Sequence, residues 1–496
     1  MRACAPAPRP RTLVLAVACA LAAGCMTVGP DYQKPNEPLP AAFKEAGPWK
    51  EAAPSDLLAR GDWWKVFNDP ILNVLEAEAH RDNPRLQAAL ARVEQARAIA
   101  GIAESYMYPY VGVDVTAGRY QASGNRPDQP SKVPGNVQYE SDYYRVPLYA
   151  SYEIDLWGKA RRLNESARAQ TDATIAAYQA VLLSMEGEIA QNYFALRISD
   201  EEIRILRSSV ELRRRARDTV ASRKQAGIAS EFDLVRLETE LAAAEAEVHA
   251  AQRRRAELEH ALAVLTGKLP ESFSVAEEPL NLKPPVIPAG LPADLLERRP
   301  DVVEAERILA ARNADIGVAQ GAYFPSIRLT AAVGYESREL SSLLDGDSVI
   351  WNFAAGLAQP LFDGGRIKGN VERTRAAYQE NLASYRQRLL VAFQEVDNAL
   401  SGLRTLDEQA LAQARAVTNA EKATTLATAR YKAGLVIVLD VIDAERTSLL
   451  AKRQNVQILN QQMAASVALI KALGGGWGDR PVPGALQQAA GAPPKS

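Results

Sequence analysis

Two segments of the chain alternate between apolar and polar side chains, a pattern that is typical of half-buried β-strands. In residues 144–156 one face carries Tyr144, Val146, Leu148, Ala150, Tyr152, Ile154 and Leu156. In residues 349–357 the corresponding face carries Val349, Trp351, Phe353, Ala355 and Leu357. Apolar-polar segments that begin near Val111 and Ile327 precede them. The pattern therefore predicts two hairpins of two strands each, over about 111–156 and 327–361.

Each predicted strand has about ten residues, which is enough for a tilted strand to cross a bilayer. The windows 106–157 and 323–362 hold 16 of the 32 Phe, Trp and Tyr residues, as in the aromatic girdles of membrane barrels. Four strands cannot close a barrel, and an open edge in lipid leaves backbone groups unpaired. Several copies must therefore share one barrel, unless the hairpins are soluble and pack on a domain.

The rest of the chain has a helical period. Two stretches lack proline, 122 residues after Pro147 and 120 residues after Pro360. Apolar residues recur there at spacings of three and four, as in a coiled-coil seam. The seam of the second stretch is Tyr378, Leu382, Tyr385, Leu389, Phe393, Val396, Leu400 and Leu403, and that of the first is Tyr178, Leu182, Met185, Ile189, Tyr193 and Leu196. Long helices packed side by side are therefore expected.

The lengths of these helices can be compared at a rise of about 1.5 Å per residue. A helix over 366–432 would extend roughly 100 Å and one over 440–473 roughly 50 Å. The helical segment after Arg299 adds about 36 Å, so two short helices stacked end to end would nearly equal the long one. We expect a helical wall with the hairpins at one end and the turns at Gly227 and Gly434 at the other.

The sequence is duplicated. Residues 83–115 match 299–331 with an offset of 216, and "DLWGKAR" at 155–161 matches "PLFDGGR" at 360–366 with an offset of 205. The turns "AGIASEFD" and "AGLVIVLD" match with an offset of 207, which pairs Gly227 with Gly434 and Asp233 with Asp440. A first repeat over 83–269, with its turn at about 226–233, is thus joined by a proline-rich linker at 270–298 to a second over 299–474, with its turn at about 433–440.

The N-terminus has the features of an export signal over residues 1–24, because three arginines precede the short apolar stretch "TLVLAVACALAAG". The only cysteines are Cys4, Cys19 and Cys25, so cleavage before Cys25 leaves one thiol and no internal disulfide. "LAAGCMT" predicts lipoprotein processing at Cys25, although Leu21 lies one place earlier than usual. A plain signal peptide with a chance cysteine is the alternative.

Charge and motifs argue against several function classes. Without the three signal arginines the chain has 55 basic and 60 acidic residues, so it offers no basic surplus for nucleic acid. No later segment has the roughly 18 consecutive apolar residues of a membrane helix. Three histidines and no HExxH or nucleophile-elbow motif argue against an enzyme and predict no metal or cofactor. A periplasmic coiled-coil scaffold remains possible, but it leaves the alternating hairpins unexplained.

Four motifs in order resemble the outer-membrane efflux factors, the TolC-like channels, and within them the NodT type of lipoprotein. They are "GDWWKVFNDPILNVL", "LLERRPDVVEAERILAARNADIGVAQGAYFPSIRLTA", "PLFDGGR" and "RYKAG" followed by "LDVIDAE". The resemblance runs from about Cys25 to Gly476. It implies a mainly α protein with a small β part, an internally duplicated long-helix coiled-coil protomer whose two β-hairpins contribute to a trimeric twelve-stranded β-barrel. Residues 25–82, the linker and the tail at 475–496 would form an equatorial region.

The resemblance also implies a function. A homotrimer in the outer membrane would form the exit duct of a tripartite efflux pump, with a periplasmic adaptor protein and an inner-membrane RND transporter as partners. A lipid on Cys25 would anchor it to outer membrane lipid, and Met26 at the next position suggests no retention in the inner membrane. A type I protein secretion channel is the alternative. No residue identifies the cargo.

The resemblance assigns roles to residues of both turns. Asp440 and Asp443 would form acidic pore rings that attract cations; alternatively, Asp440 is a helix N-cap with Asp443 in the first turn. Tyr431 and Asp233 belong to the network that closes the tip. The family's tip arginine falls at Val436, so closure would lean on the apolar "LVIVL".

The two Arg-x-x-x-Gly patterns would meet the adaptor, through Arg223 with Gly227 and Arg430 with Gly434. The alternative is that each glycine only caps its helix, with the arginine favourable to the helix dipole.

Overall fold

The computed structural model describes residues 27–36, 38, 43–44, 61–122, 139–285, 287 and 299–475. The predicted signal peptide, Cys25, residues 286 and 288–298 of the linker and the tail beyond 475 lie outside these residues. The chain divides into two compact units. The first contains Met1–Pro35, Glu94–Asp172 and Glu306–Ala383, and the second contains Asn36–Val93, Ala173–Ala305 and Ser384–Ser496.

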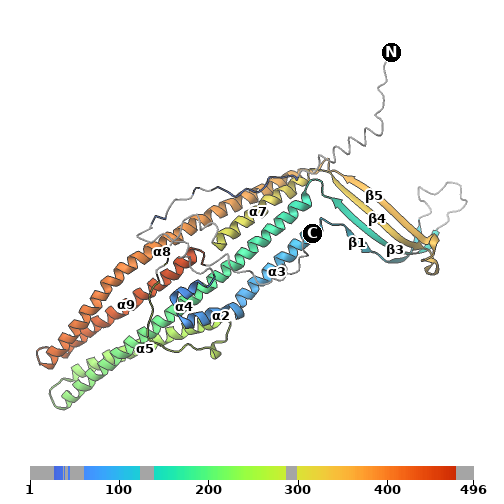
Figure 1. Cartoon of the computed structure of the whole chain (residues 1–496). Helices are drawn as coiled ribbons and strands as arrows, with labels where there is room; N and C mark the ends of the chain where they lie inside the picture. The colour runs from blue at the N-terminus through green and yellow to red at the C-terminus, as the bar shows by residue number, and fades with distance from the viewer. Residues whose placement is uncertain are drawn as a thin grey trace, which may run out of the picture. The chain divides into compact units, whose positions relative to one another are not determined.

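Helices account for most of the described residues (Figure 1). The α-helices are α2 (Pro70–Asp82), α3 (Pro84–Ser105), α4 (Lys159–Gln225), α5 (Glu231–Leu265), α7 (Pro300–Gly321), α8 (Arg366–Lys432) and α9 (Val438–Ala472). Short 3-10 turns are η2 (Trp63–Phe67), η3 (Pro270–Ser272), η5 (Leu340–Ser342) and η6 (Gly346–Ser348). The strands are β1 (Tyr110–Val113), β2 (Thr116–Ala122), β3 (Tyr139–Ile154), β4 (Ser326–Ser337) and β5 (Val349–Ala358).

The duplication is visible in the helix lengths. Both α4 and α8 have 67 residues, and both α5 and α9 have 35. The predicted helix over 366–432 is α8, and the predicted 440–473 helix begins two residues earlier, at Val438. All four helices keep the offset of 207 found at the turns, because they begin at 159 and 366 and at 231 and 438. The offset of 205 taken from "DLWGKAR" and "PLFDGGR" is therefore wrong at the helix starts, where Gly158 corresponds to Gly365.

The strands of the first unit form a single antiparallel sheet in the order β1-β3-β4-β5, with β2 also paired to β3 (Figure 1). The two predicted hairpins are joined by the pairing of β3 with β4, which runs from Tyr144 opposite Ser337 to Ile154 opposite Ile327. β1 and β2 share one register against β3, as Val113 lies opposite Leu148 and Thr116 opposite Arg145.

The interruption between β1 and β2 lies opposite Pro147. Proline has no backbone N–H to donate to a ladder. Its carbonyl still accepts a hydrogen bond from the N–H of Asp114, at 3.2 Å. The predicted first strand is therefore a single path across the sheet with a local break, so the sheet has four strand positions as expected.

The period-two pattern is confirmed, because residues directly opposite each other lie on the same face of a sheet. One face carries the row Val113, Leu148, Val333 and Trp351, and the next row along it is Val111, Ala150, Ala331 and Phe353. The opposite face carries two cross-strand ion pairs, Arg145 with Glu336 at 3.4 Å and Arg328 with Glu153 at 3.7 Å. One face is thus apolar where β3, β4 and β5 pair, and the opposite face carries these ion pairs. Beyond Tyr144 the apolar face gives way to the charged pair of Arg119 on β2 and Asp142 on β3.

The core of the second unit follows the predicted seams. All six members of the first-repeat seam are buried, and Tyr385, Leu389, Val396, Leu400 and Leu403 are the buried members of the second. Burying side chains of this size stabilises the fold by about 1.5–3 kcal/mol each. Packing of this kind, more than helix propensity, determines where such long helices stay ordered.

Among the described residues, none of the helices is both long enough and apolar enough to pass through a membrane.

Candidate functional site

The turn between α4 and α5 is a glycine-capped helix end followed at once by a new helix. Gly227 has φ +74°, and the N–H of Ile228 donates to the carbonyl of Arg223 at 2.8 Å. This is the hydrogen bond of a Schellman motif, which satisfies carbonyls at a helix end. Ser230 and Asp233 then cap α5 reciprocally: the N–H of Asp233 donates to the Ser230 hydroxyl oxygen at 3.1 Å, and that hydroxyl donates to the Asp233 carboxylate at 2.7 Å.

The turn between α8 and α9 repeats the same helix ending. Gly434 also has φ +74°, and the N–H of Leu435 donates to the carbonyl of Arg430 at 3.0 Å. Both Arg-x-x-x-Gly patterns therefore end their helices with a glycine cap. At both Gly227 and Gly434 an added Cβ would meet nothing within 4 Å, so the two turns are open on their outer side. A contact with another molecule is compatible with the caps.

The start of α9 differs from the expectation. The N-cap is Ile437, and Asp440 is the third helical residue, whose carboxylate accepts a hydrogen bond from the N–H of Ile437 at 3.1 Å. The interpretation of Asp440 as the N-cap is wrong, because an isoleucine side chain offers no acceptor and only half of a capping box forms. Asp443 lies in the second turn, not the first, where its carboxylate is 3.4 Å from Arg446. Both aspartates are exposed.

The two turns are linked to each other through Arg223 and Tyr431. The guanidinium of Arg223 donates to the tyrosine hydroxyl at 2.8 Å and lies 5.0 Å from the centre of the ring. Asp233 is occupied by its own cap at Ser230. Of the apolar stretch, Leu435 and Ile437 are 73% and 62% exposed, so within one chain they have little to pack against.

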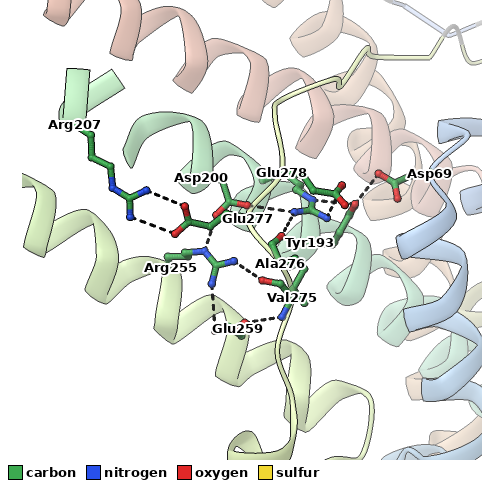
Figure 2. Close-up of polar contacts among 11 residues, drawn as sticks. Asp69, Tyr193, Asp200, Arg207, Arg255, Glu259, Val275, Ala276, Glu277 and Glu278 are labelled. Atoms are coloured by element: carbon green, nitrogen blue, oxygen red, sulfur yellow. Dashed lines mark hydrogen bonds and ion pairs between the residues drawn. The ribbon is translucent and has the colours of Figure 1, made fainter. Parts of the chain in front are cut away.

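A network of hydrogen bonds and ion pairs holds the segment after η3 on the surface of α4 and α5 (Figure 2). Arg197 donates to the carbonyl of Ala276 at 2.7 Å, and Arg255 donates to the carbonyl of Val275 and to the carboxylate of Asp200, the latter at 2.6 Å. Burial raises the pKa of Asp200, although its hydrogen bond from Arg255 acts in the opposite direction. Sequence reasoning missed both arginines, which do not differ in pattern from exposed ones.

Figure 2 also shows how the network extends to both sides. The hydroxyl of Tyr193 donates to Asp69 at 2.7 Å and accepts from Arg197 at 3.1 Å, and burial raises the pKa of this hydroxyl. Arg207 pairs with Glu277 at 2.9 Å. Removing one partner from the buried part of this network, such as Arg197 or Asp200, costs several kcal/mol, roughly 3–5. The segment is therefore a fixed part of the second unit.

Arg299, in the motif "RRPDV", joins three helices of the second unit. It pairs with Asp301 in the first turn of α7 at 2.8 Å, with Glu395 of α8 at 2.7 Å, and donates to the carbonyl of Ala472 at the end of α9, at 3.1 Å. Burial tends to raise the pKa of Asp301, but the hydrogen bond and charge of Arg299 lower it overall. The motif that carried the family resemblance thus has a physical role where the start of α7 and the end of α9 meet the middle of α8.

The segment that follows Cys25 is fixed to the foot of the sheet in the first unit. The N–H of Val28 donates to the carbonyl of Trp157 at 2.9 Å, and Arg162 pairs with Asp31 at 2.7 Å. Gly29 lies against Gly317, where an added Cβ would come within 2.5 Å of the backbone. Sequence reasoning missed these contacts, because they depend on residues far apart in the chain.

The outer membrane efflux protein family matches residues 75–268 and 291–475 of this chain. The chain is 32% identical over 463 residues to the toluene efflux pump outer membrane protein TtgF of Pseudomonas putida, covering 92% of this chain and 94% of that protein. It is 31% identical over 461 residues to the cation efflux system protein CusC of Escherichia coli O157:H7, covering 92% and 96%. The solved structure of the outer-membrane channel OprN has a TM-score of 0.83 at 30% identity, covering 91% of this chain and 99% of that one.

Proposed function

Because this chain belongs to the outer membrane efflux protein family, we propose that it is the exit channel of a tripartite efflux pump. It would act as a homotrimer with a periplasmic adaptor protein and an inner-membrane RND transporter. Efflux is favoured over protein secretion because TtgF and CusC carry efflux in their names. Those names specify toluene and cations at nearly equal identity, as expected of an exit whose cargo is chosen elsewhere.

The observation that carries the proposal is the sheet of the first unit. Its apolar face is continuous across β1, β3, β4 and β5, with Trp351, Phe353 and Leu357 at 78%, 68% and 70% exposure on β5. Within the described residues β5 pairs only with β4, and β1 and β2 pair only with β3. A sheet with a lipid-type face and two unpaired edges needs partners, since backbone groups must be hydrogen bonded in a membrane.

Three copies would supply twelve strands, an even number of the kind that transmembrane barrels use. The polar face, with the ion pairs of Arg145 and Arg328, would then line the interior. The apolar face would contact lipid.

A lipid on Cys25 would fit this arrangement. Thr27 and Val28 lie against Gly158 and Trp157, at the point where β3 leads into α4. Two residues of extended chain reach at most about 7 Å. An acyl chain on Cys25 would therefore enter the bilayer beside the base of the strands and hold the protein at the outer membrane.

The turns would form the periplasmic tip. Three copies of Asp440 and Asp443 around a narrow pore would attract cations and repel anions. Because Asp443 already shares its charge with Arg446, the cation preference would depend mainly on Asp440. The bond between Arg223 and Tyr431 would restrain the tip, together with Asp233, and the open sides of Gly227 and Gly434, with Arg430, would meet the adaptor.

Single-channel recording tests the proposal. We expect purified protein to form long-lived, cation-preferring channels of low conductance in planar bilayers at neutral pH. Absence of conductance, from protein that circular dichroism shows to be folded, would contradict the channel function.

A further inference from the structure

The second unit contains a cavity that none of the roles above uses. It is a partly open pocket of about 470 Å³ between α4, α8 and α9. Ile205 and Leu212 of α4, Val417 of α8, and Leu449 and Val456 of α9 supply its apolar walls. Small-molecule sites in proteins have volumes of roughly 300–1,000 Å³. The lining of this cavity is mixed, because polar side chains such as Ser208, Ser209 and Asn455 lie between the apolar ones. The cavity is of that size.

One carboxylate in this cavity has no partner. No hydrogen bond or ion pair among the described residues reaches Glu445 of α9, which is partly buried there. The other carboxylates of the cavity are neutralised locally: Glu201 pairs with Arg204 of α4, and Glu421 of α8 pairs with Lys452 of α9 at 2.8 Å.

Burial raises the pKa of Glu445 to about 7, and the positive charge of Arg213 of α4 opposes the shift. Arg213 itself pairs with Glu240 at 3.6 Å. A bound cation would therefore meet a single uncompensated carboxylate, whose charge is present above about pH 7.

The duplication provides a comparison within the chain. The residue 207 positions before Glu445 is Glu238 of α5, which is exposed on the helix surface. Arg204 of the cavity corresponds in the second repeat to Leu411, which is 69% exposed. The cavity is thus built from residues of both repeats and is not a feature that each repeat contains.

The chemistry of the cavity points to one class of ligand. We propose that it binds an amphipathic organic monocation, whose charge lies against Glu445 and whose apolar body packs on Ile205, Leu449 and Val456. A divalent metal ion is a poor alternative, because such ions need several oxygen ligands and no group of three or more metal-ligating side chains is suitably placed in the described part of the chain. The proposal does not depend on conduction, since binding is measured without a pore.

Ethidium is a suitable probe, because it is planar, apolar and permanently charged, so that any pH dependence arises from the protein. We would titrate it into purified full-length protein at pH 8 and follow its fluorescence anisotropy. Saturable binding with one site per chain is expected. A charge-assisted contact predicts that Glu445→Gln weakens binding about tenfold or more. The matched variant Glu238→Gln should bind as the wild type does.

Two further experiments distinguish binding in the cavity from a general attraction of the cation to the charge of the protein. Ser209→Trp places an indole at the cavity wall and leaves Glu445 intact, so it should abolish binding. Lowering the pH from 8 to 5.5 should weaken binding to the wild type and leave Glu445→Gln unchanged. Equal affinity of wild type and Glu445→Gln would overturn the proposal, as would tight binding by a correctly folded Ser209→Trp. If Ser209→Trp does not fold, the comparison with Glu445→Gln and the pH dependence decide, and wild-type binding that is equal at pH 8 and pH 5.5 would also overturn the proposal.

Discussion

The guanidinium of Arg223, at the end of α4, donates a hydrogen bond of 2.8 Å to the hydroxyl of Tyr431, at the end of α8. These two residues join the two halves of the duplicated chain at their turns. The arginine is also the third residue from the end of a glycine-capped helix, so its side chain and its backbone serve different purposes. The backbone carbonyl of Arg223 accepts the hydrogen bond of the glycine cap, which holds the turn in its conformation. The side chain of Arg223 holds this turn to the other one through Tyr431.

Removing the tyrosine hydroxyl should loosen the tip. Tyr431→Phe removes the acceptor but keeps the ring near Arg223, so it should forfeit about 0.5–1.5 kcal/mol, which corresponds to roughly a two- to tenfold larger open fraction. Single-channel conductance or open probability should rise accordingly. Arg430→Ala, at the matching place in the other turn, is the control and should behave as the wild type without an adaptor present. Unchanged gating of Tyr431→Phe would show that this bond does not restrain the tip.

Neutralising Asp440 should change the ion selectivity of the channel more than neutralising Asp443. Asp440→Asn keeps an oxygen that can accept from the N–H of Ile437, so the helix start should survive while the charge is lost. Reversal potentials in a salt gradient should then show a clear loss of cation preference. Asp443→Asn should have a smaller effect, because Arg446 already compensates that charge. Selectivity that is the same in wild type and Asp440→Asn would remove the ring assignment.

Bulky residues at the turn glycines should abolish efflux but not assembly. Gly227→Leu or Gly434→Leu adds strain of about 1–2 kcal/mol at a positive φ, with no neighbouring atom to clash. Transport measured in cells that contain the cognate adaptor and transporter should fail while trimers still reach the outer membrane. Gly364→Leu carries similar strain in equally open space at φ +65°, outside the turns, and should leave efflux intact. Normal transport by both turn variants would exclude a docking role.

The pH dependence of stability should reveal Glu445. Its pKa rises from 4.5 to about 7 on folding, so its contribution to stability is present below pH 4.5 and is lost as the pH rises through 7. Near pH 4.5, Glu445→Gln should therefore have the same melting temperature as the wild type. At pH 8 its free energy of unfolding should be larger than that of the wild type, by about 1–2 kcal/mol after allowing for partial solvent exposure. Thermal melts of both proteins between pH 4.5 and pH 8, with Glu238→Gln as control, would measure this stability difference. A stability difference that does not grow with pH would contradict the assignment.

The parts of the fold that follow a repeating pattern could be predicted from the sequence. The alternation through Leu148 and Trp351 predicted not only strands but the face on which each side chain lies, because a pleat has a period of two. The pairing of β3 with β4 could not be predicted, since nothing local to either hairpin specifies its neighbour. The break opposite Pro147 follows from the missing N–H of proline, but only once the pairing is known.

The residues of the candidate site could likewise be predicted where a local sequence pattern marks them, and not where they depend on distant partners. Gly227 and Gly434 were found because a helix end has a sequence signature, whereas the N-cap at Ile437 was missed because isoleucine is a poor cap. Arg162 and Arg299 act through partners more than 90 residues away, which a single sequence does not reveal. Glu445 did leave a signal: it lies at helical spacing between the buried Ile442 and Leu449, on a face where a charge is out of place.

The claim that three chains share one barrel is tested most directly by sedimentation of the purified protein in a mild detergent, with conductance measured on the same preparation. Three chains per particle, together with channels in planar bilayers, is the predicted result. A stable, folded monomer with an unpaired sheet edge and no conductance would contradict the account.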